Sequence, residues 1–182
     1  MSARRQIAAC LLPLAWATVG ASAHAQDTQR LNRGNDPFFS VSQAVAQCPQ
    51  PLGPLETESE WRGESHWRVE RGNSCWWEGR CRLSNGYLYD KEIAEAVKRR
   101  LANIEPATHW KEKTTLWLML QRRFVYVQGC VAPGFDKKAF LAELAKTADV
   151  ERVIDDMMDD PGGKPPYRTL AHPDVIPPDS SE

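Results

Sequence analysis

The sequence predicts an α+β fold: a small three-stranded mixed sheet with two helices on one face, in the order αββαβ, over residues 89–158. Three observations predict it. An apolar stripe with helical spacing opens the segment, two short apolar runs separated by three residues follow, and a second helical stretch leads into a third strand-like run. A disulfide-stapled, β-rich extension is expected to precede this unit.

The first expected helix begins at Asp90, a residue type that commonly caps helices. Its apolar residues recur every third or fourth position, which places them on one face: Ile93, Val97, Leu101 and Ile104. Pro106 is expected to end the helix, because proline lacks the backbone N–H that a helix interior requires.

Two β-rich runs come next, Thr114 to Leu120 and Phe124 to Val131. Both are short and apolar, as buried strands are. The three residues between them, Gln121 to Arg123, indicate a tight turn, so the two strands are expected to pair antiparallel.

A second helix and a third strand complete the unit. Pro133-Gly134 ends the second run, and Asp136 is expected to cap a helix. The apolar residues of that helix give it a buried face: Phe140, Leu141, Leu144 and Ala145. The run from Val150 to Met158 then predicts the last strand.

Three stretches carry a resemblance to a known family: the helix start Asp90-x-x-Ile93, the strand end Val127-Gln128-Gly129-Cys130-Val131, and the closing Ala148-Asp149-Val150-Glu151-Arg152-Val153. Together they resemble a BON domain, present once. Asp149 stands where that family commonly has glycine. The resemblance implies a non-catalytic envelope role: attachment to phospholipid membranes, including anionic ones, and support of envelope integrity under stress.

Residues 1–25 are expected to be a secretory signal peptide. Arg4 and Arg5 precede an apolar run from Ile7 to Gly20, and Ala23-His24-Ala25 places small residues where a signal peptidase cleaves. The run is about fourteen residues long, whereas a membrane span needs roughly twenty. We therefore expect export to the periplasm, with cleavage after Ala25.

The charge of the chain is nearly balanced, with 23 basic and 24 acidic residues. The expected cleavage removes two arginines and no acidic residue, which leaves a net charge of about −3. Nucleic-acid-binding proteins usually carry a clear basic excess, so nucleic acid is not expected as a partner. No later segment is apolar for long enough to predict a transmembrane span.

Four cysteines remain after the expected cleavage, an even number that predicts two disulfides with three possible pairings. Cys75 and Cys81 are near neighbours, so a bridge between them is the simplest pairing, and Cys48 would then bond Cys130. That second bridge would close a loop of about eighty residues and contribute on the order of 4 kcal/mol in the chain-entropy model. Neither spacing nor compartment favours the competing zinc site of Cys75, Cys81 and His66.

The segment before the main unit is expected to fall into two parts. Residues 26–55 read as a flexible lead-in with a short helix from Asp36 to Gln47. Residues 56–88 interleave tryptophan with arginine, and His66 to Arg71 and Ser74 to Trp77 are expected to pair as a hairpin.

The tail, residues 159–182, contains six prolines and two adjacent glycines, with few apolar residues. This composition predicts a disordered or extended segment. We expect it to be a solvated end, and docking on a partner is the alternative.

The sequence contains no constellation of catalytic or metal-binding residues. There is no Gly-x-Ser-x-Gly motif and no glycine-rich phosphate loop after a strand. The histidines His66, His109 and His172 lie in separate regions without metal-ligand spacing. No enzyme activity, metal or cofactor is therefore expected.

The function is expected to come from basic residues that would contact anionic lipid headgroups, each contributing roughly 1 kcal/mol near the bilayer: Lys91, Lys98, Arg99, Arg100, Arg122 and Arg123. The alternative is a protein–protein interaction module of an envelope or secretion complex. In that case Trp76, Trp77 and Arg80 of the expected hairpin would grip the partner. Both sets of residues also have a purely structural interpretation. The basic residues would then be the solvated sides of helices, and the tryptophans would be buried in a small core.

Overall fold

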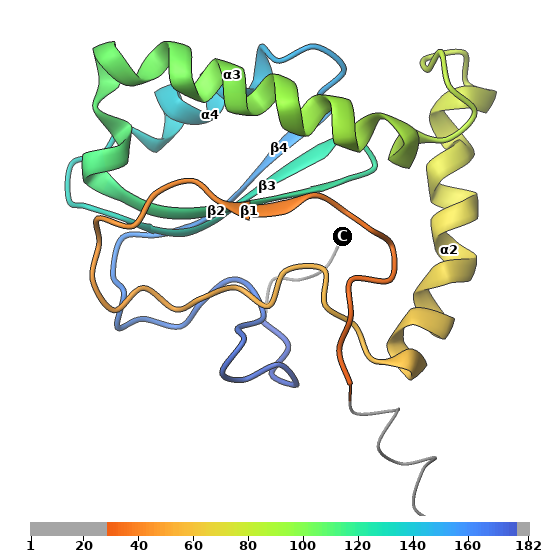
Figure 1. The fold of residues 1–182 in the computed structure, drawn as a ribbon, viewed down its shortest axis with the longest axis horizontal. Coiled ribbons are helices and arrows are strands. Elements are labelled where there is room, and N and C mark those ends of the chain that lie inside the picture. The colour runs from red at the N-terminus through yellow and green to blue at the C-terminus, as the bar shows by residue number, and fades with distance from the viewer. Residues whose placement is uncertain (1–28, 178–182) are drawn as a thin grey trace, which may run out of the picture.

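The computed structural model describes residues 29–177. The predicted signal peptide and its cleavage site lie outside the described residues. A mixed four-stranded sheet carries two helices on one face, a third helix stands at its side, and irregular segments cross below the other face (Figure 1).

The sheet has the strand order β1-β2-β3-β4. Its strands are β1 (Phe38–Ser40), β2 (Thr114–Gln121), β3 (Phe124–Val131) and β4 (Arg152–Met158). The first three strands pair antiparallel, and β3 pairs with β4 in parallel. The structure therefore confirms an α+β fold with a mixed sheet, but the sheet has four strands where the sequence predicted three.

Strand β1 comes from the segment that was predicted to form a short helix from Asp36 to Gln47, and that prediction is wrong. The backbone of this segment finds its partners on β2 instead: Leu120 N donates to Pro37 O at 2.9 Å, and Val41 N donates to Leu116 O at 2.9 Å. These bonds satisfy the backbone groups that a helix would otherwise pair internally.

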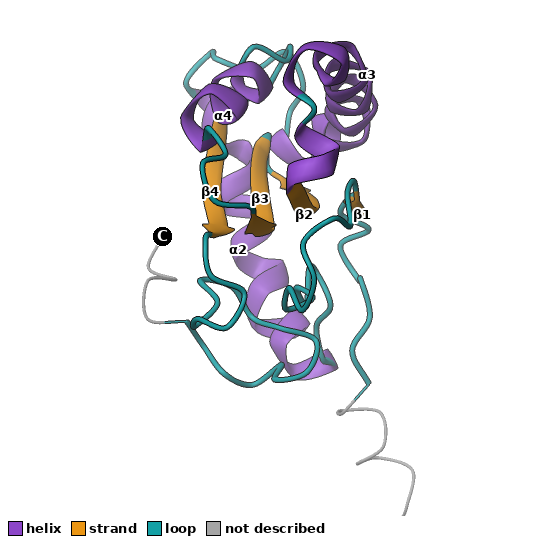
Figure 2. Ribbon diagram, turned by 90° about the vertical axis from the view of Figure 1, so that its left-hand side faces the viewer, coloured by secondary structure: helices purple, strands orange, loops and turns teal. Residues whose placement is uncertain are grey.

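Helices α3 (Asp90–Thr108) and α4 (Lys137–Ala145) cover one face of the sheet (Figure 2). Ile93, Val97 and Leu101 are at most 3% exposed, so the predicted stripe of α3 is the face that packs on the sheet. The segment from α3 to β4 thus has the predicted order αββαβ. Asp136 caps α4 as predicted, because its side chain accepts the N–H of Ala139.

The predicted end of α3 at Pro106 is wrong, because the helix continues to Thr108. Proline near the end of a helix removes one backbone hydrogen bond but does not stop the last turn. His109 stops it instead with a left-handed backbone (φ 49°), and its N–H donates to Glu105 O.

Helix α2 (Glu58–Trp77) replaces the predicted hairpin, which is wrong. A capping box starts the helix: the Thr57 side chain accepts the N–H of Glu60, and the Glu60 carboxylate accepts the N–H of Thr57. Gly72, which separates the two arms of the predicted hairpin, lies inside the helix at its contact with the short helix η1 (Gly86–Tyr89). A Cβ atom there would lie 2.3 Å from Asn85 Oδ1, so glycine permits this close approach.

Both disulfides are present with the pairing that the sequence predicts, Cys48–Cys130 and Cys75–Cys81. Cys48–Cys130 ties the segment before α2 to β3. Cys75–Cys81 joins the last turn of α2 to the segment that follows the helix, where the sequence predicted a bridge that staples a hairpin.

Part of the described tail packs on the fold, where the sequence predicted a disordered or extended, solvated end. Tyr167 is 5% exposed and packs beside Cys130 and Met158. The tail also pairs with the segment before α2, because Leu52 N donates to Arg168 O at 2.8 Å. None of the described helices is both long and apolar enough to cross a membrane.

A buried ion pair holds α2 against the rest of the fold. Arg68 of α2 donates to both carboxylate oxygens of Asp36, at 2.9 and 2.6 Å. The Arg68 guanidinium also lies 3.8 Å from the Tyr87 ring, and Gln121 at the end of β2 donates to Asp36. These contacts join the segment before β1, α2, η1 and the sheet.

We expect Asp36→Ala and Arg68→Ala each to lower the free energy of unfolding by about 3–5 kcal/mol, because each leaves one buried charge without its partner. The double variant should lose clearly less than the sum of the two single losses. Urea unfolding measures all three variants. Arg62→Ala is the control, because this arginine of α2 is 77% exposed and should change the free energy by at most about 0.5 kcal/mol. Additive losses would contradict the prediction.

Candidate functional site

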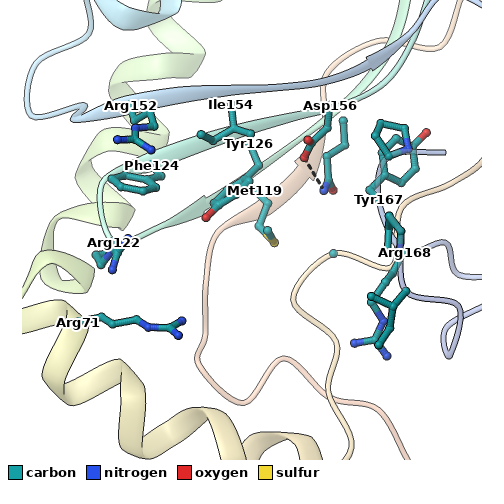
Figure 3. Close-up of a pocket in the computed structure, with 15 residues that line it drawn as sticks. Arg71, Met119, Arg122, Phe124, Tyr126, Arg152, Ile154, Asp156, Tyr167 and Arg168 are labelled. Carbon is teal, nitrogen blue, oxygen red and sulfur yellow. Dashed lines mark hydrogen bonds between the residues drawn. The ribbon is translucent and has the colours of Figure 1, made fainter. Parts of the chain in front are cut away.

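A cleft of about 590 Å³ lies on the face of the sheet opposite to α3 and α4 (Figure 3). Arg71 of α2 lines one side, and residues 166–168 and 176–177 of the tail line the other. Successive side chains of a strand point to opposite faces, so the floor consists of residues that the core does not use: Met119, Phe124, Tyr126, Gln128, Arg152, Ile154 and Asp156.

Two arginines contact one aromatic ring at one end of the cleft. The guanidinium carbon of Arg122 lies 4.7 Å from the centre of the Phe124 ring, and that of Arg152 lies 5.2 Å from it. Figure 3 shows Phe124 between the two side chains, with Arg71 below them. Among residues 29–177, no carboxylate forms an ion pair with Arg122 or Arg152. We call Arg122, Phe124 and Arg152 the arginine end.

The opposite end of the cleft contains Gln128 and Asp156, which are neighbours across β3 and β4. Burial raises the pKa of Asp156 to about 6, while the hydrogen bond from Gln128 lowers it and the charge of Asp155 raises it further. Between the two ends, burial raises the pKa of Tyr126, and the charge of Arg122 opposes this shift. The cleft is therefore cationic at one end and rich in acceptors at the other.

The turn between β2 and β3 sets the direction of Arg122. Arg122 and Arg123 both have left-handed backbones (φ 55° and 69°), which two-residue hairpin turns require but arginine rarely adopts. The carboxylate of Asp90 accepts both backbone N–H groups, at 2.8 and 2.7 Å. Burial raises the pKa of Asp90 to about 7, and the two N–H donors oppose this shift.

The two arginines of the turn point to different places. Arg122 lines the cleft. Arg123 instead donates to Asp149 O at 2.8 Å and to Glu151 at 3.3 Å, and lies 5.3 Å from the Tyr89 ring. Asp90 thus fixes a turn in which Arg122 lines the cleft and Arg123 donates hydrogen bonds to residues just before β4.

The residues predicted to bind lipid lie on different parts of the molecule: Lys91, Lys98, Arg99, Arg100, Arg122 and Arg123. On α3, Lys98 pairs with Glu95 at 2.7 Å, and Arg100 lies 3.4 Å from Glu143 of α4. Only Arg122 of the six lines the cleft, across the sheet from α3. The structure does not bring these side chains together as one basic face.

The residues predicted for a protein-binding hairpin lie instead at the end of α2. Trp76 is 45% exposed and Trp77 is 80% exposed, and Leu83 after them is 36% exposed. Arg80 pairs with Glu78 at 2.6 Å and with Glu151 at 2.9 Å. We call residues 76–83 the α2 tip; the Cys75–Cys81 disulfide closes it onto the helix.

Most residues of the cleft were not predicted as functional. Phe124, Tyr126 and Gln128 alternate along β3, and this period of two was the available signal that one face of the strand avoids the core. Arg71 and Arg152 carried no such signal, because the contact between α2 and the sheet edge is not visible in the sequence.

The comparisons with known proteins found no counterpart: no family model, no curated protein and no solved structure matches the chain. The resemblance to a BON domain therefore stays a prediction.

The lining of the cleft suits binding of an organic anion. Two guanidiniums can donate hydrogen bonds to a carboxylate or phosphate, and the aromatic floor can contact an apolar part of the same ligand. None of the described lining residues is a serine, cysteine or histidine. Within residues 29–177, no group of three or more His, Cys, Asp or Glu side chains is arranged to hold a metal ion.

We expect Asp90→Ala to lower the free energy of unfolding by about 2–4 kcal/mol, because two backbone N–H groups of a strained turn lose their acceptor. Placing Asn-Gly at positions 122 and 123 in that background should restore part of the loss, since these residues adopt left-handed backbones readily. Urea unfolding measures both variants. Asp136→Ala, at the cap of α4, is the matched control and should lose about 1 kcal/mol. Equal losses for the two single variants would contradict the role given to Asp90.

Proposed function

We propose that this protein is a non-catalytic, exported binding protein, and that it acts as a protein–protein interaction module whose cleft holds an extended acidic segment of its partner. The observation that carries this proposal is the arginine end. Arg122 and Arg152 are held against Phe124, and no carboxylate among the described residues neutralises them.

An anionic partner group follows from the chemistry of this end. A guanidinium stacked on an aromatic ring keeps its N–H donors in the plane of the group, free to meet a carboxylate edge-on. The fixed position also reduces the entropy lost when the ligand binds.

A peptide suits the cleft better than an acyl chain does. Along β3 the floor carries two aromatic side chains and then a polar one, Phe124, Tyr126 and Gln128. An acyl chain on this floor would leave the buried Gln128 Oε1 without a hydrogen-bond donor and would offer none to Asp156, which is unfavourable. A peptide backbone carries N–H and C=O groups at matching intervals and can satisfy such side chains.

The proposal includes export of the protein from the cytoplasm. Two disulfides in a chain of this size favour an oxidising compartment, and the predicted signal peptide favours the periplasm. A BON-like role in the cell envelope is consistent with both.

The proposal is tested with the C-terminally amidated tetrapeptide Ala-Ala-Ala-Glu and its glutamine counterpart. The mature protein should bind the glutamate peptide at least about tenfold more tightly, because a carboxylate makes charge-assisted hydrogen bonds with arginine. NMR titration of isotope-labelled protein measures the affinity, and the signals of Tyr126 and Ile154 should shift.

Arg122→Gln and Arg152→Gln should each remove most of the preference for glutamate. Arg99→Gln is the matched control, because it removes one exposed arginine of α3 from the other side of the sheet. Equal binding of the two peptides, or equal losses in all three variants, would remove the cleft as the binding site.

A second candidate function is attachment to an anionic phospholipid surface, and the exposed α2 tip favours it. Trp76 and Trp77 are exposed beside Arg80 and Arg82, a combination typical of side chains at a membrane interface. In this alternative the tip would enter the headgroup region, and the basic residues of α3 would add weak, salt-sensitive attraction.

Vesicle flotation tests this second function. If the tip attaches the protein, the double variant Trp76→Ser with Trp77→Ser should lose most flotation on anionic vesicles, because the apolar contacts are removed. Trp67→Ser is the control, since Trp67 is 49% exposed on α2 away from the tip. Equal flotation of the tip variant and the wild type would exclude the tip, and no flotation at all would exclude the function.

A further inference from the structure

We call Gln128 and Asp156 the acceptor end of the cleft. One buried acceptor atom there has no hydrogen-bond donor among the described residues. Gln128 is only 7% exposed, and its Oε1 has no hydrogen-bond partner among the residues that the structure describes. Its Nε2 donates to Asp156 Oδ2 at 3.3 Å, which Figure 3 shows as a dashed line. The amide orientation follows from chemistry, because the reverse would place Oε1 against a carboxylate. The acceptor Oε1 is therefore left over.

The surrounding side chains do not supply the missing donor. Tyr167 lines this end of the cleft, but its hydroxyl donates to Pro49 O at 2.9 Å. Asp156 is an acceptor as well, and no ion pair joins it to a basic residue within positions 29–177. A buried acceptor without a donor is unfavourable, so a ligand that brings a donor would gain from both groups.

The two ends of the cleft are separated by a fixed length. Arg152 and Asp156 are four residues apart on β4, and Phe124 and Gln128 are four apart on β3. At the rise of a β-strand this corresponds to about 13 Å. An extended peptide has the same rise per residue, so about four of its residues span the cleft from one end to the other.

We propose that the cleft recognises a bipolar peptide: an acidic group binds Arg122 and Arg152, and an amine about four residues away binds Gln128 Oε1 and the Asp156 carboxylate. The peptide N-terminus or a lysine side chain supplies such an amine. This inference rests on the proposed function and adds the second charge and its spacing. An ammonium group provides three N–H donors, enough for both acceptors at once.

The test compares two forms of one probe on the mature protein: amidated Ala-Ala-Ala-Glu with a free N-terminal amine, and the same peptide with an acetylated N-terminus. We expect the free amine to bind about tenfold more tightly, the effect of one charge-assisted hydrogen bond. Gln128→Met keeps the length of the side chain and removes the acceptor, and Asp156→Asn removes the charge. Each variant should reduce the tenfold preference to less than about threefold.

Asp174→Asn is the matched control, because this carboxylate is 87% exposed and does not line the cleft, and it should keep the full preference. NMR spectra of the free variants establish that each is folded, and the wild-type comparison needs no variant. Equal affinity for the two wild-type probes, with glutamate still preferred over glutamine, would overturn the bipolar ligand and leave the proposed function standing. Preference for the amine that persists in both Gln128→Met and Asp156→Asn would also overturn it. Failure of every probe to bind would overturn the proposed function itself.

Discussion

The hydrogen bonds between Asp90 and the β2–β3 turn connect the helical layer of this protein to the face of the sheet that carries the cleft. Arginine is a poor residue for a left-handed turn, yet two occur in succession, and the buried carboxylate at the start of α3 accepts both of their N–H groups. With the turn fixed, Arg122 reaches the cleft and Arg123 reaches the start of β4. A turn of Asn-Gly would be easier to form, but it would supply neither guanidinium.

The elements that the sequence predicted are those whose signals are local or periodic. The stripe from Ile93 to Ile104 specifies α3 because only one face of that helix meets the sheet, and the two apolar runs specify β2 and β3. The disulfide pairing was predictable because Cys75 and Cys81 are near neighbours in sequence, which left Cys48 to pair with Cys130. These features depend on neighbours in the chain or on a regular period.

The features that were missed depend on partners far away in sequence. Helix α2 has no continuous apolar stripe, since it is held to the fold by Gly72 against η1, by the buried Cys75 and by the ion pair of Arg68 with Asp36. Its tryptophans and glycine therefore looked like a hairpin, and the capping box at Thr57 was the one local sign of a helix. The packing of Tyr167 in the tail was missed for the same reason, because its partners lie beside the Cys48–Cys130 bridge.

The same distinction separates the basic residues along α3 from those that line the cleft. The residues of α3 stand on a surface with carboxylates at helical spacing, and pairs such as Lys98 with Glu95 satisfy them locally. Arg122 and Arg152, in contrast, come together only in the fold, because the β2–β3 turn and the parallel strand β4 place both beside the Phe124 ring. A chain with almost no net charge can thus hold a strongly charged site, because recognition depends on which side chains the fold leaves without partners and not on how many the sequence contains.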